Sequence, residues 1–167
     1  MLASAALTFA MAGPELRALA IEAIRTHPQP PYGRPAYASG RTARELAEEH
    51  GEDFVQLTGP AHIQALITGR GPTKSSTAGE PMLREIIAQW ARDKPGFELR
   101  PGQTYEGFGY VVARRIHEEG TALFRLGEPS GLFDKILSGD YLDTLKARIA
   151  AGEMVAITTA LQHALGA

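Results

Sequence analysis

Apolar residues spaced three and four positions apart predict helices in several parts of the chain. The first covers residues 14–26, with a proline at its first position, and ends at His27-Pro28. The second follows Pro81, and the third runs from a Thr104 N-cap to a Gly120 terminator. Their apolar stripes contain Leu83, Ile86, Ile87 and Trp90 in the second helix, and Tyr105, Phe108, Val112 and Ile116 in the third. We expect these two stripes to pack together as the main helical core.

The pattern after residue 131 predicts a C-terminal region of broken helices. Asp140 is a candidate cap for one of them, and Gly152 is expected to interrupt it. A last helix is predicted from the apolar positions Met154, Ile157, Leu161 and Leu165.

Shorter patterns predict some sheet in the first half of the chain. Residues 53–58 suit a short strand that stops at Gly59-Pro60. Ile63, Ala65 and Ile67 alternate with other positions and favour a second strand, although so short a run could also be helical. Thr42 and Glu45 have capping-box spacing and favour a helix that ends at Gly51.

The length of 167 residues fits a single domain, 1–167. Within it, residues 27–38 form a Pro-rich loop or arm that we expect to be extended, and residues 69–80 form a surface loop. Residues 1–13 are apolar and end in Ala10-Met11-Ala12, which mimics a signal peptide, but no basic residue precedes the run. We therefore expect a terminal arm that packs on a neighbour. No stretch reaches the length of a membrane-spanning helix.

Charge and composition narrow the class of function. Seventeen basic and nineteen acidic residues leave a net charge of -2, which argues against a protein that coats nucleic acid. The chain has no cysteine, which excludes disulfides and thiolate zinc sites. The balanced composition is that of an ordinary globular protein.

Each candidate for catalytic or cofactor chemistry has a simpler explanation. Lys74-Ser75 follows Gly69 at the spacing of a phosphate loop, but Thr73 replaces the required glycine and Pro72 lacks an N–H donor. His117-Glu118-Glu119 points three side chains in successive directions around a helix, which does not suit one metal ion. We therefore predict no catalytic residue, no cofactor and no metal ligand. Five basic residues could form a surface patch or pair with nearby acids: Arg70, Lys74, Arg114, Arg115 and Arg125.

Several short motifs occur in a characteristic order between residues 36 and 137. They are Ser39-Gly40-Arg41-Thr42-Ala43, Gln56-Leu57-Thr58-Gly59-Pro60, Gly69-Arg70-Gly71-Pro72-Thr73, the Ile86–Trp90 helix, the run Val112–Thr121, and Leu123-Phe124-Arg125. This order resembles the tail-completion, or neck, proteins of tailed bacteriophages, which join capsid to tail.

The resemblance implies an α+β fold, with a small antiparallel sheet packed by several helices and a helical C-terminal region. It implies a structural, non-enzymatic virion protein that forms a homo-oligomeric ring at the neck or tail end and is assembled in the host cytoplasm. Its partners would be copies of itself and neighbouring neck, portal-adaptor or tail-tube proteins, with no membrane. DNA would pass through the lumen without sequence-specific binding. Family members have an extended strand after the Ser-Gly-Arg segment, which leaves residues 42–50 undecided between helix and strand.

The loop of the third motif is the expected subunit or partner contact, through Arg70, Gly71, Pro72, Thr73 and Lys74. Arginine suits such a contact because its planar fork binds carboxylates or carbonyls on a neighbour. The alternative function is a small enzyme or regulatory ligand-binding module whose site is assembled from residues scattered along the chain.

Overall fold

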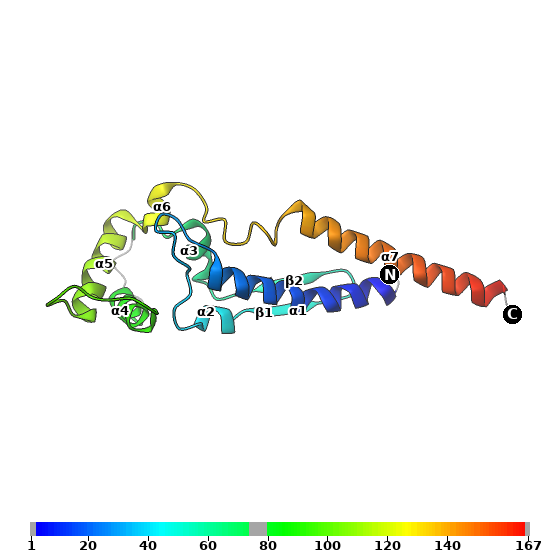
Figure 1. Cartoon of the computed structure of the whole chain (residues 1–167), viewed down its shortest axis with the longest axis horizontal. Coiled ribbons are helices and arrows are strands. Elements are labelled where there is room, and N and C mark those ends of the chain that lie inside the picture. Colours follow the sequence, from blue (N-terminus) through cyan, green and yellow to red (C-terminus); the bar gives the residue numbers. More distant parts are fainter. Residues whose placement is uncertain (1–2, 74–79, 166–167) are drawn as a thin grey trace. The chain divides into compact units, whose positions relative to one another are not determined.

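The computed structural model describes residues 3–73 and 80–165, which fold as an α+β protein, as predicted (Figure 1). The chain divides into two compact units. The first, called here the long-helix unit, combines residues 1–23, 45–60 and 133–167. The second, the helix-pair unit, combines residues 24–44 and 61–132. The elements in chain order are α1 (Ala3–Thr26), α2 (Arg41–Arg44), β1 (Ala47–His50), β2 (Val55–Thr58), α3 (Ile63–Thr68), α4 (Leu83–Asp93), α5 (Tyr105–Glu119), α6 (Ala122–Leu126) and α7 (Gly139–Leu165).

In the long-helix unit, the antiparallel hairpin β1–β2 lies against α1. Its register pairs Ala47 with Thr58 and His50 with Val55. Gly13 of α1 is buried, and a Cβ there would stand 3.0 Å from the Cγ of Glu48 in β1. The Nε of Arg17, one turn further along α1, donates to the carbonyl of Leu46 at 2.8 Å. The absent side chain of Gly13 therefore lets the strand approach the helix closely.

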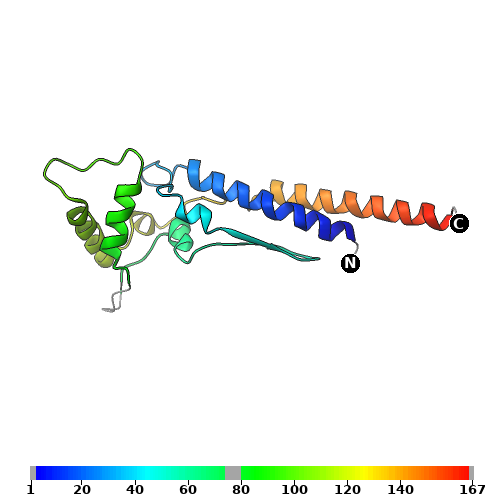
Figure 2. The ribbon, with the colours of Figure 1, turned by 90° about the horizontal axis from the view of Figure 1, so that it is seen from below.

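The α7 helix is tied to α1 by a charged pair. Arg148 Nη1 lies 2.5 Å from Glu15 Oε2, and Arg148 Nη2 lies 3.4 Å from Glu15 Oε1. Burial, followed by the nearby charge of Glu15, raises the pKa of the Tyr141 phenol on the same helix. Both views show the end of α7 extending beyond the start of α1 (Figure 2).

The predicted start of the first helix, at residue 14, is wrong, because α1 begins at Ala3 and carries Pro14 inside it. Proline removes one intrahelical hydrogen bond. Alanine-rich sequence before Pro14 has the highest helix propensity, and burial of Ala12 and Ala20 adds packing on both sides of it. These contributions offset the loss of that hydrogen bond.

Residues 41–50 contain both a helix and a strand. The capping-box prediction is wrong, because α2 stops at Arg44 and Thr42 lies inside it. The Thr42 hydroxyl lies 2.8 Å from His62 Nε2 instead of capping a longer helix. The chain then extends, with Leu46 buried, into β1. A strand after the Ser-Gly-Arg segment is therefore present.

The strand predicted at Ile63–Ile67 is wrong, because these residues lie in α3. The strand predicted at residues 53–58 is confirmed as β2, whose hydrogen-bonding partner is β1. Six residues with three alternating apolar positions fit a short helix as well as a strand. As a helix, the segment satisfies backbone groups within itself.

The α4 and α5 helices form the centre of the helix-pair unit, and the predicted ends of α5 are confirmed. Thr104 Oγ1 accepts a hydrogen bond from the Gly107 N–H at the start of α5, and the Gly120 N–H donates to the Ile116 carbonyl at its end. The α4 helix begins two residues after Pro81, where the Glu85 carboxylate accepts from the Met82 N–H at 3.1 Å.

The predicted contact face between α4 and α5 is only partly right. The helices pack together, but the buried residues are small: Ala88, Ala91, Gly109 and Ala113. Ile86 and Trp90 are 47% and 40% exposed. Trp90 meets the edge of Phe97 at 5.8 Å between ring centroids, and Phe97 lies 4.9 Å from Phe108. Close approach of the two backbones leaves the larger apolar side chains at the border of the contact.

The Pro-rich segment folds back on itself instead of extending throughout. Gln29 and Arg34 form an antiparallel bridge, and the Gly33 N–H donates to the Gln29 carbonyl at 2.8 Å. Gly33 permits this turn because its φ is +63°. Lys94, at the end of α4, donates through Nζ to the carbonyls of Pro35 and, at 2.5 Å, Tyr37. Burial, followed by the charge of Arg34, lowers the Lys94 pKa.

The predicted break of the C-terminal helix at Gly152 is wrong, because α7 is continuous. A single glycine costs a helix only about 1 kcal/mol, which favourable neighbours offset. The predicted cap is also wrong, because Ser138 Oγ, and not Asp140, accepts from the Tyr141 N–H at 3.4 Å. Asp140 lies in the first turn.

Candidate assembly interface

The Gly69–Thr73 segment, expected to contact a neighbouring subunit, is attached to the junction between α5 and α6. The Thr121 N–H donates to the Arg70 carbonyl at 2.8 Å, and the Arg70 N–H donates back to Thr121 Oγ1 at 2.9 Å. The Thr73 N–H donates to the His117 carbonyl at 3.1 Å. Three separated motifs of the resemblance therefore meet in one hydrogen-bonded junction, which we call the motif junction: residues 69–73 and 117–125.

Glycine is required at two positions of the motif junction. Gly69 and Gly120 have φ angles of +78° and +81°, which disfavour any other residue. A Cβ at Gly69 would overlap the backbone nitrogen of Phe124, and one at Gly120 would stand 2.8 Å from the Arg70 carbonyl oxygen. The two backbone segments therefore touch without intervening side chains.

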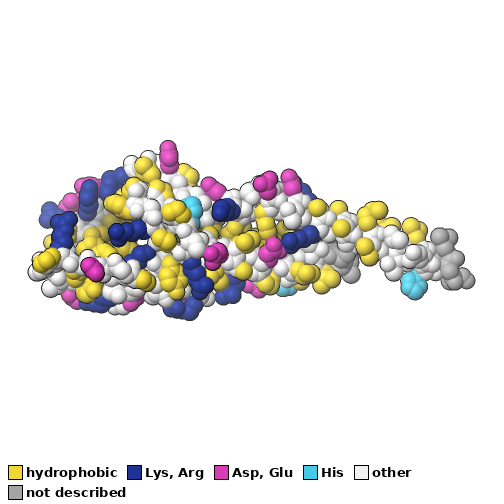
Figure 3. Space-filling view, viewed as in Figure 1, with side chains coloured by type: hydrophobic (Ala, Val, Ile, Leu, Met, Phe, Trp, Pro, Cys, Tyr) yellow, Lys and Arg dark blue, Asp and Glu magenta, His cyan; other side chains and the backbone are white. Residues whose placement is uncertain are grey.

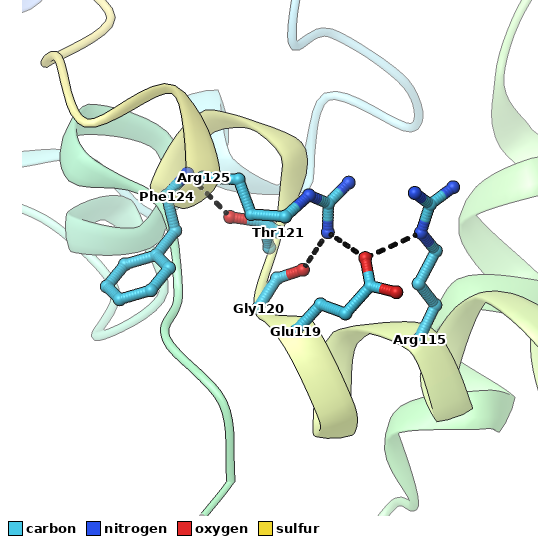
Figure 4. Close-up of polar contacts among 6 residues, drawn as sticks. All are labelled: Arg115, Glu119, Gly120, Thr121, Phe124 and Arg125. Carbon is cyan, nitrogen blue, oxygen red and sulfur yellow. Dashed lines mark hydrogen bonds and ion pairs between the residues drawn. The ribbon is translucent and has the colours of Figure 1, made fainter.

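Charged side chains reinforce the same junction (Figure 4). Arg125 Nη1 donates to the Gly120 carbonyl at 2.6 Å and lies 3.3 Å from Glu119 Oε2. Arg115 Nε donates to the same carboxylate at 3.0 Å. The hydrogen bond from Arg115 is the main cause that lowers the pKa of Glu119. Glu119 thus holds two arginines from α5 and α6 at the turn between these helices.

Thr121 connects this turn to α6. Its hydroxyl oxygen accepts from the Phe124 N–H at 3.3 Å, which caps the helix (Figure 4). The same oxygen accepts from the Arg70 N–H. One side chain therefore serves both the helix start and the attached segment.

The expected contact residues differ in where the structure places them. Arg70 is exposed, and its Nη2 donates to Thr73 Oγ1 at 3.3 Å. Thr73 Oγ1 also lies 2.7 Å from His117 Nδ1. Gly71 passes close to the Phe124 ring, and Pro72 is exposed. Lys74 lies outside the described residues. The segment 70–73 therefore presents a guanidinium on a backbone held in place by α5 and α6.

For three of the five basic residues, Arg114, Arg115 and Arg125, the structure shows the expected alternative, pairing with nearby acids. Arg114 pairs with Glu118 one turn later at 2.9 Å. Arg115 and Arg125 share Glu119. Because each of these three arginines is paired with a carboxylate, they do not combine into an unpaired basic patch.

A groove of about 1010 Å³ lies within the helix-pair unit. It is bordered by residues 36–43 of the Pro-rich segment and α2, and by the outer face of α4. Its apolar lining includes Ile24, Leu66, Ile86, Ala88, Trp90 and Tyr110. The fold-back of the Pro-rich segment builds one wall, and the exposed stripe of α4 builds the other.

Large apolar side chains are exposed on both units (Figure 3). In the long-helix unit they include Leu7, Met11, Leu137, Met154, Val155 and Leu161. In the helix-pair unit they include Ile86, Tyr110, Val111 and Phe124. Where such side chains form a contiguous patch, the patch is typical of a surface that binds another macromolecule.

Among residues 3–73 and 80–165, the structure brings no three His, Asp or Glu side chains close enough to hold a metal ion. His117 is engaged with Thr73, and Glu118 and Glu119 are engaged with arginines. Over the same residues, no helix combines the length and apolar character needed to cross a membrane.

Sequence reasoning found the motif junction only as separate motifs and missed the groove. The signal for the junction was present in the two glycines, since each ends a helix and has the left-handed φ that such ends require. The groove depends on the Pro-rich segment turning back through Gly33, and this tertiary contact leaves no periodic pattern.

Comparison of the chain with protein-family models, with curated proteins and with solved structures finds no match.

Proposed function

We propose that the chain is a structural subunit of a closed homomeric ring at the head-to-tail junction of a tailed-bacteriophage particle. The observation that supports this most is the set of large apolar side chains exposed on both units, which a ring would bury between copies. Met154, Val155 and Met11 are each more than 60% exposed. The order of motifs that resembles neck proteins supports the placement at the head-to-tail junction.

The motif junction supports a mechanical role. A neck subunit has to hold one surface in a fixed position while it contacts neighbours, and pre-organised segments lose less freedom on binding. The segment 69–73 is fixed by hydrogen bonds to Thr121 and His117, yet it keeps the Arg70 side chain exposed. Arg70 would bind carboxylates or carbonyls of the next subunit or of a neck, portal-adaptor or tail-tube protein.

In this proposal the protein resides in the virion, at the neck or tail end. DNA would pass through the ring lumen without sequence-specific contacts. Such passage requires no strongly basic surface, and the net charge of -2 together with the internally paired arginines agrees with it.

The experiment is to locate the chain in purified particles. Antibody labelling of a tagged full-length chain, followed by electron microscopy, should place it at the junction between capsid and tail. Particles that lack the chain should accumulate as separate heads and tails. Complete, infectious particles without the chain would contradict the proposal, and so would label confined to an unrelated enzyme or receptor.

A further inference from the structure

The groove of the helix-pair unit has aromatic and apolar lining residues that stay open to solvent. Ile86, Trp90 and Tyr110 line it and are 47%, 40% and 55% exposed. A pocket for a small molecule covers most of the surface of its ligand. Because the lining side chains are this exposed, they do not enclose a small ligand, and the groove suits a segment of another protein.

Arg84, in the first turn of α4, is a charged group of this groove without a partner. Its side chain is exposed and forms no hydrogen bond or ion pair with another residue of the ranges 3–73 and 80–165. The positive end of the helix dipole disfavours a cation in the first turn. A carboxylate from another protein would therefore be attracted both by the guanidinium and by the helix start.

The acidic side chains of the groove already have partners within the unit. Among the described lining residues, each carboxylate is engaged: Glu106 by Arg92, Glu85 by the Met82 N–H and Asp93 by Gln89 Nε2. His62 Nε2 lies 2.8 Å from the Thr42 hydroxyl. Arg41 adds positive charge on the wall that faces α4. A partner with many negative charges, such as nucleic acid, would be repelled by the three carboxylates, so a partner with one acidic group fits better.

The positions of the lining residues on α4 set the spacing that such a partner needs. Arg84 precedes Ile86 and Trp90 by about 3 Å and about 9 Å along the helix axis, at 1.5 Å per residue. An extended segment advances about 3.3 Å per residue. An acidic residue bound to Arg84 would thus be about one to three positions from an apolar residue packed on Ile86 or Trp90.

We propose that the helix-pair groove docks a segment of a second protein that carries one acidic residue about one to three positions from an aromatic or large aliphatic residue. The acidic side chain binds Arg84, and the apolar side chain packs on Ile86 and Trp90. The site goes beyond the proposed ring, because its partner is a protein other than the chain itself and its binding does not require ring closure.

Selection of displayed random peptides on the full-length chain tests which chemistry the groove prefers. The selected peptides that lack tryptophan are tested for a change in the fluorescence of Trp90, because the chain has one tryptophan. Those that change it should be enriched in Asp or Glu at the stated spacing from an apolar residue. Recovery of only neutral or basic peptides, or of none that changes the Trp90 emission, would overturn the proposal.

Arg84→Glu reverses the charge of the site without opposing the helix. Glutamate is favoured in the first turn, so circular dichroism and the melting temperature should not deteriorate. Affinity for the selected acidic peptides should fall by about tenfold or more, as expected for a lost hydrogen bond between charged groups. Selection repeated on this variant should yield basic peptides instead. Arg100→Glu is the matched control, because Arg100 is exposed on the same unit and outside the groove lining. Equal weakening by the two variants would overturn the docking site.

Two other probes test different occupants. A single-stranded oligothymidine should change the Trp90 fluorescence less than the selected peptides do, and tighter binding of the oligonucleotide would assign the groove to nucleic acid. Phenylacetate carries an acid and a ring without a peptide backbone, and it should displace a selected peptide at least about tenfold less well than the same unlabelled peptide does. Equal displacement would assign the groove to a small ligand. Either result would overturn the protein partner.

The two proposals fail separately. If the peptides fail to bind while the unchanged chain forms closed rings, the docking site is wrong and the proposed function remains. If the chain forms no ring but binds acidic peptides through Arg84, the proposed function fails and the docking site remains.

Discussion

The packing of the helix-pair unit depends on the absence of a side chain larger than hydrogen at Gly109. A Cβ at this position of α5 would overlap the carbonyl oxygen of Arg84 and stand 3.1 Å from the Ala88 Cβ in α4. The rigid obstacle is backbone, which cannot turn aside as a side chain would. The close contact of α4 and α5 therefore depends on glycine at position 109.

Gly109→Ala should accordingly destabilise the protein. Alanine in a helix interior normally adds about 0.5–1 kcal/mol to stability. Here the overlap should dominate and lower the free energy of unfolding by about 1–3 kcal/mol. Gly139→Ala is the matched control, because no heavy atom lies within 4 Å of the added Cβ at the start of α7. Denaturant unfolding measures both, and equal stability of the two variants would show that α4 and α5 are not in close contact.

Glu119 gives the motif junction a pH dependence. Its folded-state pKa is lowered, first by the Arg115 hydrogen bond, from an ordinary value of 4.5. Stability from a lowered acid pKa is present above the unfolded value and is lost as the pH falls through the folded value. Glu119→Gln should therefore reduce the melting temperature near neutral pH and have a smaller effect in acid.

Melting curves from about pH 7 to about pH 3 measure the difference between variant and parent. Glu128→Gln is the control, since Glu128 is exposed and forms no ion pair with another residue in the described part of the chain. A difference for Glu119→Gln that stays constant with pH would mean that the carboxylate does not hold the two arginines in solution.

At the scale of elements, Thr121 joins the start of α6 to the segment 69–73. Thr121→Val removes the acceptor for two backbone N–H groups, of Arg70 and Phe124, while keeping the shape of the side chain. We expect a loss of about 1–2 kcal/mol, as for other lost N-caps. Thr121→Ser retains the hydroxyl and should restore most of the stability. The amide protons of residues 70 and 124 should exchange faster in Thr121→Val than in Thr121→Ser. Equal exchange rates in the two variants would contradict the proposed attachment.

The elements that sequence patterns predicted well have a strong local cause. The α5 helix starts at Thr104 and ends at Gly120, because both residues satisfy helix ends through their own chemistry. The start of α1 and the continuity of α7 through Gly152 were missed, because proline and glycine are only statistical breaks whose cost packing can offset. For the α3 segment a strand was favoured and a helix left open, because so short an alternating run fits both periods.

The residues of the candidate site were predictable from the sequence, but the way in which the fold brings them together was not. Arg70 and Thr73 were expected to make contacts because of their composition and motif position, and the structure holds their backbone against α5 and α6. The pairing of Arg70 with Thr121 joins residues 51 positions apart, which no local pattern encodes. The small contact face at Ala88 and Gly109 was missed because periodicity favours large apolar residues over small ones.

At the scale of the whole molecule, folding and assembly should separate. Arg70→Ala combined with Lys74→Ala should leave circular dichroism and the melting temperature nearly unchanged, because the Arg70 side chain is exposed and surface charges contribute little to folding. Joining of heads to tails should weaken, since the guanidinium would contact a neighbour. The control is Arg114→Ala, which removes an exposed charge that is already paired with Glu118. A normal yield of particles from the double variant would mean that residues 69–80 only connect neighbouring elements and do not contact another subunit.

The central claim is that the chain assembles into a closed ring of identical subunits. The most direct measurement is native mass spectrometry of the full-length chain, alone and on isolated particles, combined with electron cryomicroscopy of the same samples. We predict one closed oligomer of fixed copy number, seen as a ring between capsid and tail. A strictly monomeric or dimeric chain in both samples, with a mass shift only on adding a small ligand, would contradict the claim and favour a ligand-binding module.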